Sequence, residues 1–420
     1  MKAIFFPLIL SVSLLQADGT AAADMLTTAL RTGDLTTIET LLSFGLDPKL
    51  PDRHGQTPLR LALLSNQTKV VELLLARNVD PNAPLDNSPF PAMPLEYALE
   101  YGSLRAASIL IAAGANVDAK GPKGRTALHF AVVGRHLDVL QLLIEKGADL
   151  NVRDAEGASP LDDAVWRGSL DAVAILLAHG ARLNESDTQT GATPINEAAY
   201  RGNTSVVQYL LQFHPDVRIP DKRGYSPLDN AIRMGKEDSS LLLLDAEPKE
   251  RQTPQFFARV MDAAIGKDES LMVEALLRHG APANDTLLSG STPLDAAASA
   301  GSVKVVRVLL ENGASPNTSG RNGTTPLEEA SLKGFDSIVS MLLDHGALVD
   351  RLNSRSGTTA LYAAASFGKG DVVKLLLDRG ANPSLCGNNR RSPYQAALEN
   401  GYSEVATQIR NRGGVRSCEK

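Results

Sequence analysis

The sequence predicts an all-α solenoid of helix-turn-helix units joined by short β-turn or hairpin connections. Three observations predict this fold class. The chain has 420 residues, which is long for one compact core, so several domains or a repeat array is expected. Aromatic residues make up only 5% of it, which favours a thin helical core of small and straight-chain side chains. A glycine turn followed by Thr or Ser and then an apolar residue recurs with a period of about 33 residues.

Residues 1–23 are expected to be a secretory signal peptide. Lys2 precedes an apolar run from residue 3 to residue 15, and small and polar residues follow. This run is too short to cross about 30 Å of hydrocarbon as a permanent helix, but it suits a cleavable signal. A capping helix buried in the fold is the competing interpretation of this segment. We expect cleavage after Ala17, with Ala21 and Ala23 as chemically sensible alternatives.

Residues 24–414 are expected to form twelve repeats, with repeats 1–7 over 24–250, repeats 8–12 over 251–414 and a C-terminal tail at 415–420. Each regular repeat opens on a turn such as GQTPL or GSTPL, in which Thr or Ser caps the first helix and Pro occupies its first position. A second helix such as VVELLL has one apolar face and ends at a glycine. Since so short a helix pair cannot bury its apolar face alone, the repeats must stack on one another.

This pattern strongly resembles the ankyrin repeat, whose motif is T-P-L-H-x-A on a 33-residue period. The resemblance extends over about residues 24–414, which is essentially all of the mature chain. The motif histidine is kept only at His129. We expect the residues that replace it to make hydrogen bonds to turn backbone between repeats. They include the carboxylates Glu96, Asp162, Asp229, Asp295 and Glu328.

Two joints interrupt the period. Five prolines fall between Pro81 and Pro94, and they are expected to project a stiff, extended finger that bears Phe90. The turn motif is missing from residues 241–269, where charges concentrate. This second joint is expected to bend the solenoid or to form a hinge between repeats 1–7 and repeats 8–12.

No pattern typical of a catalytic or metal site is present. The sequence lacks G-x-S-x-G, H-E-x-x-H, C-x-x-C, G-x-G-x-x-G and the P-loop motif, and its seven histidines are scattered. We therefore expect no enzymatic activity, no cofactor and no metal. The net charge of −6 has the wrong sign for a chain that binds nucleic acid as a whole. The only cysteines, Cys386 and Cys418, leave a disulfide and two unpaired thiols as open alternatives.

The resemblance implies that two positions before the glycine of each first helix point into a concave face. In the middle repeats these positions carry residue types that are enriched at interface hot spots. Together with Phe90 on the finger, we predict the following protein-binding residues: Tyr101, Trp166, Arg167, Tyr200, Arg201, Arg233 and Met234. The arginines predict a partner with an acidic surface. The competing interpretation is that the arginines only solvate this face and that Trp166 packs on the neighbouring first helix.

These observations predict an exported, monomeric, non-catalytic protein that binds another protein in the periplasm or outside the cell. It is expected to be soluble, with no stable membrane insertion after signal cleavage. Two roles are open, a scaffold or stabiliser of an envelope enzyme and an inhibitor of the immunity-protein type. A secreted effector acting on host proteins is an alternative. An intracellular ankyrin adaptor is another, if the N-terminal segment is not a signal. Fold alone does not choose among these roles.

Overall fold

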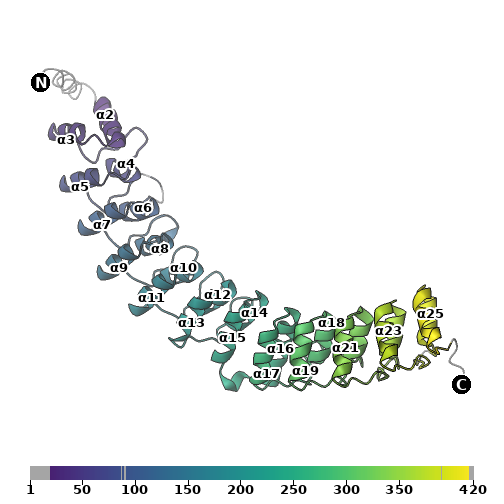
Figure 1. The fold of residues 1–420 in the computed structure, drawn as a ribbon. Coiled ribbons are helices and arrows are strands. Elements are labelled where there is room, and N and C mark those ends of the chain that lie inside the picture. The colour runs from purple at the N-terminus through teal and green to yellow at the C-terminus, as the bar shows by residue number, and fades with distance from the viewer. Residues whose placement is uncertain (1–18, 87, 89–90, 389, 416–420) are drawn as a thin grey trace. The chain divides into compact units, whose positions relative to one another are not determined.

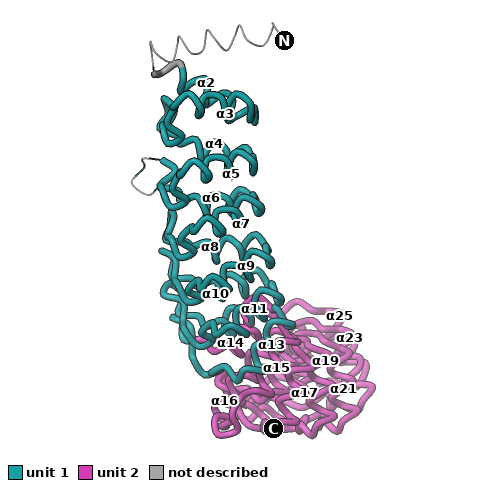
Figure 2. The backbone as a smooth tube through the Cα atoms, turned by 90° about the vertical axis from the view of Figure 1, so that its left-hand side faces the viewer, with its two compact units in different colours: residues 1–198, 203–224 teal, residues 199–202, 225–420 magenta. Residues whose placement is uncertain are grey.

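The computed structural model describes residues 19–86, 88, 91–388 and 390–415. Over these residues the chain forms 24 α-helices, two short 3-10 turns and no strand, which confirms the all-α class (Figure 1). It divides into two compact units (Figure 2). Unit 1 comprises residues 1–198 and 203–224, and unit 2 comprises residues 199–202 and 225–420. Most of the predicted signal peptide and most of the predicted tail lie outside the described residues.

Unit 1 contains the first eleven complete helices, and α12 (Pro194–Arg201) starts in it. The helices are α2 (Gly19–Thr32), α3 (Leu35–Ser43), α4 (Pro58–Leu64), α5 (Thr68–Ala76), α6 (Pro94–Glu100), α7 (Leu104–Ala112), α8 (Ala127–Val133), α9 (Leu137–Glu145), α10 (Pro160–Trp166), α11 (Leu170–Ala178) and α13 (Thr204–Leu211). The 3-10 turn η1 (Pro122–Gly124) precedes α8.

Unit 2 continues the same alternation of helices. They are α14 (Pro227–Arg233), α15 (Glu237–Ala246), α16 (Pro254–Gly266), α17 (Ser270–Arg278), α18 (Pro293–Ala300), α19 (Val303–Glu311), α20 (Pro326–Lys333), α21 (Asp336–Asp344), α22 (Ala360–Ser366), α23 (Gly370–Asp378), α24 (Pro393–Glu399) and α25 (Ser403–Asn411). The 3-10 turn η2 (Lys249–Arg251) lies between α15 and α16, in the second predicted joint.

The helices of each unit stack in two rows. In unit 1, α4, α6, α8 and α10 contact one another in chain order, and α5, α7, α9 and α11 form the second row (Figures 1 and 2). In unit 2, α16, α18, α20, α22 and α24 form one row and α15, α17, α19, α21, α23 and α25 form the other. Each pair therefore buries its apolar face against the pairs before and after it, as a repeat array requires.

The repeat that contains α10 and α11 shows why the sequence folds this way. The Ser159 side chain accepts a hydrogen bond from the backbone N–H of Asp162, and the Asp162 side chain accepts one from the backbone N–H of Ser159. This capping box satisfies donors that a helix start leaves unpaired. Pro160 occupies the first turn, where its missing N–H is not needed. In the second helix, Val173 and Leu176 are completely buried.

The carboxylates at the motif-histidine position support the turns, as expected, but they do so in two ways. Asp162, Asp229 and Asp295 accept hydrogen bonds from the N-cap N–H of their own repeat, at 2.9, 3.0 and 3.1 Å. Glu328 instead accepts bonds from two side chains of the next repeat, Asn353 at 2.8 Å and Thr358 at 2.9 Å. The expected bonds to turn backbone between repeats are made by the imidazole of His129 and the amide of Asn196. Their partners are the carbonyl oxygens of Ala158 and Ile219, at 3.1 and 2.8 Å.

The finger is closed at its base. The backbone N–H of Leu85 donates to the carbonyl oxygen of Ala92 at 3.0 Å, and the Leu85 side chain is buried. Phe90 lies outside the described residues, so its predicted role as a binding residue stays a prediction.

Glu96, which stands at the motif-histidine position of α6, is buried without a matching donor. Its side chain is 2% exposed, and neither carboxylate oxygen has a hydrogen bond of normal geometry within the described chain. Burial raises the pKa of Glu96 to about 8; the backbone of Gly121 opposes the shift and Glu100 adds to it. At neutral pH the group is therefore protonated in the folded protein, whereas in the unfolded chain it is ionised.

We expect the variant Glu96→Gln to be more stable than the parent protein above pH 7. Because the folded pKa lies above the unfolded one, unfolding releases a proton, and the parent loses stability as pH rises from about 4.5 to about 8. The amide needs no proton, so the variant should lose this part of the pH dependence and gain on the order of 1–3 kcal/mol at about pH 8. Urea denaturation between about pH 5 and pH 8 measures both effects.

The matched control is Glu145→Gln, an exposed glutamate at the end of α9. It should leave the pH dependence of unfolding unchanged. A Glu96→Gln variant with the same pH dependence as the parent would contradict the assignment of a protonated, buried Glu96.

Candidate protein-binding face

The first helices of several repeats end in exposed large side chains just before a glycine. Tyr101 is the C-cap residue of α6 and is 55% exposed; Trp166 ends α10 and is 46% exposed. Tyr200 in α12 and Met234, the C-cap residue of α14, are 39% and 42% exposed. Ala164 and Val165, the two residues before Trp166 in α10, are completely buried. Each of these first helices therefore has one buried face and one exposed face, and these four side chains lie on the exposed face.

The end of α10 is fixed by the following repeat. Gly168 has φ +64°, and the side chain of Asn203 lies 3.2 Å from the position that a Cβ atom on this glycine would take. The Asn203 amide also donates to the carbonyl oxygen of Val165 at 3.0 Å. Since these contacts hold the backbone on both sides of Trp166, the indole is presented from a rigid position rather than from a loop.

Trp166 does not fill a hole in the core, because nearly half of its surface is exposed. Its ring is accompanied by Arg167, whose guanidinium carbon lies 5.2 Å from the ring centroid. A guanidinium at this distance interacts favourably with the π face and restricts the rotamers of both side chains. The two residues therefore form a combined aromatic and cationic surface at the end of α10.

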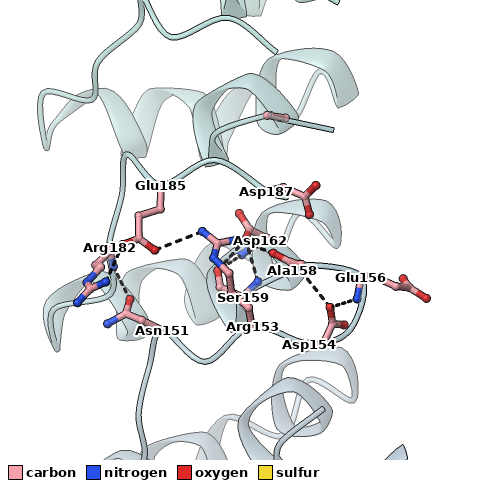
Figure 3. Close-up of polar contacts among 12 residues, drawn as sticks. Asn151, Arg153, Asp154, Glu156, Ala158, Ser159, Asp162, Arg182, Glu185 and Asp187 are labelled. Carbon is pink, nitrogen blue, oxygen red and sulfur yellow. Dashed lines mark hydrogen bonds and ion pairs between the residues drawn. The ribbon is translucent and has the colours of Figure 1, made fainter. Parts of the chain in front are cut away.

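A different set of arginines is neutralised by carboxylates in the turns next to α10 (Figure 3). Arg153 lies 3.7 Å from the Asp162 carboxylate and 3.2 Å from that of Glu185. Arg182 binds Glu185 at 2.7 Å, and its backbone N–H donates to the Asn151 side chain at 2.9 Å. These arginines hold adjacent turns together, so they differ in role from Arg167 at the helix end.

Burial also affects the acidic residues of this region. It raises the pKa of Asp163 to about 6, although the nearby Arg125 guanidinium, 3.4 Å from the carboxylate, opposes the shift. Hydrogen bonding to Arg182 lowers the pKa of Glu185. The turn network therefore stays ionised at Glu185 near neutral pH, whereas Asp163 titrates close to it.

The predicted residues are divided between the two units. Tyr101, Trp166 and Arg167 belong to unit 1, and Tyr200, Arg201, Arg233 and Met234 belong to unit 2. Within unit 1, α8 separates α6 from α10, and it ends at Val133 with Gly134 as its C-cap. Within unit 2, the Lys236 side chain packs against Gly202, so the segments that follow α12 and α14 are neighbours there.

Three residues that the sequence did not single out contribute to these groups. The Arg233 guanidinium lies 3.7 Å from the ring centroid of Tyr225, and Arg60 lies 5.4 Å from that of Tyr97. Tyr97 in turn packs on Tyr101 with ring centroids 4.4 Å apart. A sequence signal exists for Tyr225, which is an aromatic residue directly after the turn glycine in GYSPL. Arg60 stands at the motif-histidine position, and no sequence pattern predicts its contact with an aromatic ring of the next repeat.

The described residues also bear on metal binding and on membrane insertion. Across residues 19–415, apart from the undescribed positions, no group of three or more His, Cys, Asp or Glu side chains is placed to hold a metal ion. None of the helices in the described part of the chain has the length and apolar character needed to cross a membrane. Cys386 is disulfide-bonded, and the chain's other cysteine, Cys418, lies outside the described residues.

Comparison with known proteins identifies the repeat. A family model described as "Ankyrin repeats (3 copies)" matches residues 8–84, 95–187, 180–252, 260–353 and 347–416. The chain is 32% identical over 114 residues to the cyclin-dependent kinase 4 inhibitor B of Rattus norvegicus. That match covers 27% of this chain and 85% of the relative. The same protein of Mus musculus is 32% identical over 121 residues, which covers 29% and 90%.

A third relative is matched over a smaller part of its length. The nuclear factor NF-kappa-B p105 subunit of Gallus gallus is 37% identical over 97 residues, which is 23% of this chain. The chain spans only 10% of that relative.

Proposed function

Because the chain belongs to the ankyrin-repeat family and is therefore a protein-interaction scaffold, we propose that it binds another protein through its first-helix face, without catalysis. The first-helix face is the surface formed by the exposed C-terminal ends of the first helices. The observation that carries the proposal is the rigid presentation of Trp166 with Arg167 stacked on it. Trp, Tyr and Arg dominate interface hot spots because they bury a large area at a low cost in conformational entropy.

The charge of this face supports a partner with an acidic surface. Arg167, Arg201 and Arg233 end first helices in consecutive repeats, although the whole chain has a net charge of −6. Opposite charge on a partner would raise the rate of association and fix the orientation of the complex. Salt should therefore weaken the complex by screening these charges.

Two roles fit such a surface. One is a scaffold or stabiliser of an enzyme, and the other is an inhibitor of a target protein. The names of the rodent relatives describe inhibitors of cyclin-dependent kinase 4, and this chain matches nearly their full length. This favours inhibition of a target protein as one concrete role, in the manner of an immunity protein that neutralises a toxin. A secreted effector acting on host proteins is the alternative, as is an intracellular adaptor if residues 1–23 are not a signal.

Export is part of the proposal, and two observations support it. Helix α2 begins at Gly19, and Ala22 and Leu26 are 2% exposed. Cleavage after Ala17 leaves this helix whole, whereas cleavage after Ala23 would remove the buried Ala22. The disulfide at Cys386 also fits a periplasmic or extracellular compartment, where disulfides persist.

We expect the mature protein to begin at Asp18. Intact mass and N-terminal sequencing of the chain from the periplasm and the culture medium should show the loss of the first 17 residues. The double variant Leu8→Arg/Leu10→Arg interrupts the apolar run and should leave the chain unprocessed inside the cell. An unprocessed parent chain that stays in the cytoplasm would contradict export and favour the intracellular adaptor.

The double variant Trp166→Ala/Arg167→Glu should lose more than about 2 kcal/mol of binding free energy, or roughly thirtyfold in Kd. The partner is first captured from an envelope extract with the tagged full chain and identified by mass spectrometry, and its Kd is then measured by calorimetry. The free energy of unfolding should change by less than about 0.5 kcal/mol for each substitution because both side chains lie at a helix end on the surface.

The matched control is Phe213→Ala/Lys146→Glu, which makes the same kinds of change at the ends of second helices. Phe213 is 43% exposed, and Lys146 is exposed at the C-cap of α9. This control should bind the partner normally. Equal affinities for the parent and the Trp166→Ala/Arg167→Glu variant, with both folded, would rule out the first-helix face.

A further inference from the structure

The second joint contains a cavity. Its volume is about 720 Å³, and it lies within unit 2 between α15, η2, α16 and α17. Its lining residues are Leu241, Asp245, Lys249, Gln252, Phe257, Ala275, Arg278 and His279. This volume falls in the range that binds small organic ligands.

The cavity lies where the second joint replaces the usual turn hairpin with a short connection, residues 247–253, whose hydrogen bonds and ion pair are made within the connection itself. After α15, the chain passes through Pro248 and η2 and enters α16 at the N-cap residue Thr253. Glu247 is buried and binds Arg251 at 2.9 Å, and its carbonyl oxygen accepts a bond from the Gln252 amide at 3.1 Å. Because these bonds join residues within the connection, Lys249 and Gln252 form one wall of the cavity instead of filling it.

Asp245, the acidic residue of the lining, already forms an ion pair that links two repeats. The Asp245 carboxylate lies 2.9 Å from Nε2 of His279. The same link between consecutive second-helix ends recurs later in unit 2. Arg379 binds Asp344 at 2.8 Å and Arg412 binds Asp378 at 2.5 Å.

Arg278 breaks this pattern. It stands at the second-helix position that Asp344 and Asp378 occupy in their repeats, two residues before the closing glycine. The residue one repeat later that would face it is Asn312, whose amide donates to the carbonyl oxygen of its own Val308 at 2.8 Å. Within the described chain, no carboxylate lies within ion-pair distance of Arg278 or of Lys249. The cavity is therefore lined by two exposed cations that have no ion-pair partner in the described chain.

Apart from the Gln252 amide, the remaining lining is apolar. Leu241, Phe257 and Ala275 provide an aliphatic and aromatic surface beside the two cations. A ligand that fits must therefore combine an anionic group with an apolar or aromatic body.

We propose that this cavity binds a phosphate or carboxylate group on an aromatic or apolar carrier, with Lys249 and Arg278 as its anion ligands. The site is separate from the first-helix face and does not depend on the proposed function. The anionic group has two chemical sources, a free small molecule and a modified or acidic side chain of a protein. Lys249 supplies a point charge, and the planar guanidinium of Arg278 can bind two oxygens at once.

Calorimetric titration of the full-length chain with phenyl phosphate tests the proposal. The parent should bind phenyl phosphate saturably and more tightly than inorganic phosphate, because Phe257 and Leu241 contact the ring. The variant Lys249→Gln/Arg278→Gln should bind at least about tenfold more weakly. Lys304→Gln/Arg307→Gln removes two exposed cations of α19 in the same unit and should bind like the parent.

A second titration distinguishes the sources of the anion. A short peptide with one phosphotyrosine between neutral residues should bind more tightly than phenyl phosphate if the natural ligand is protein-borne, and no more tightly if it is a small molecule. The absence of saturable phenyl phosphate binding would overturn the proposal. Equal affinities for the parent and Lys249→Gln/Arg278→Gln, with thermal unfolding unchanged, would do the same.

Discussion

The constraint on which the rest of this structure depends is that no helix pair can bury its own apolar face. Helix α10 has seven residues and α11 has nine, which is too short for an isolated helix to be stable in water. Val173 and Leu176 become completely buried only because the neighbouring pairs cover them. The capping boxes, the glycines that close each helix and the small alanines at the contacts all serve this stacking.

Stacking also explains why a few outward residues are informative. The inward positions are occupied mainly by Ala, Val, Leu and Ile, whereas the outward ends of the helices can vary without loss of stability. Nothing in the stacking requires a tryptophan at position 166, since the neighbouring repeat has Val133 at the equivalent end of its helix. Nothing requires an arginine at position 278 either, since later repeats use that position for an aspartate that binds the next repeat. Both residues therefore point to functions outside the fold.

The sequence was sufficient for the fold class and the repeat register, because a 33-residue period places every residue relative to a known turn, but it left open whether Trp166 is exposed or packs on the neighbouring helix. It was not sufficient to show that Arg233 stacks on Tyr225 or that Arg60 faces Tyr97, because cross-repeat side-chain contacts leave no periodic signal. The cavity also could not be predicted from the sequence, because residues 241–269 lack the turn motif that sets the repeat register. The same holds for the buried state of Glu96, which depends on its fit against Gly121. The binding role of the predicted residues, the export of the chain and the position of a hinge stay predictions.

The most direct test of the central claim is site-specific photo-crosslinking at position 166. Trp166 is replaced by p-benzoylphenylalanine in the full-length chain, and the producing cells are irradiated. The same replacement at Phe213, on the end of a second helix, serves as the reference. The account predicts a covalent adduct with one other protein from position 166 and none from position 213. Adducts of equal yield at both positions, or none at position 166, would contradict the claim that the first-helix face binds a partner.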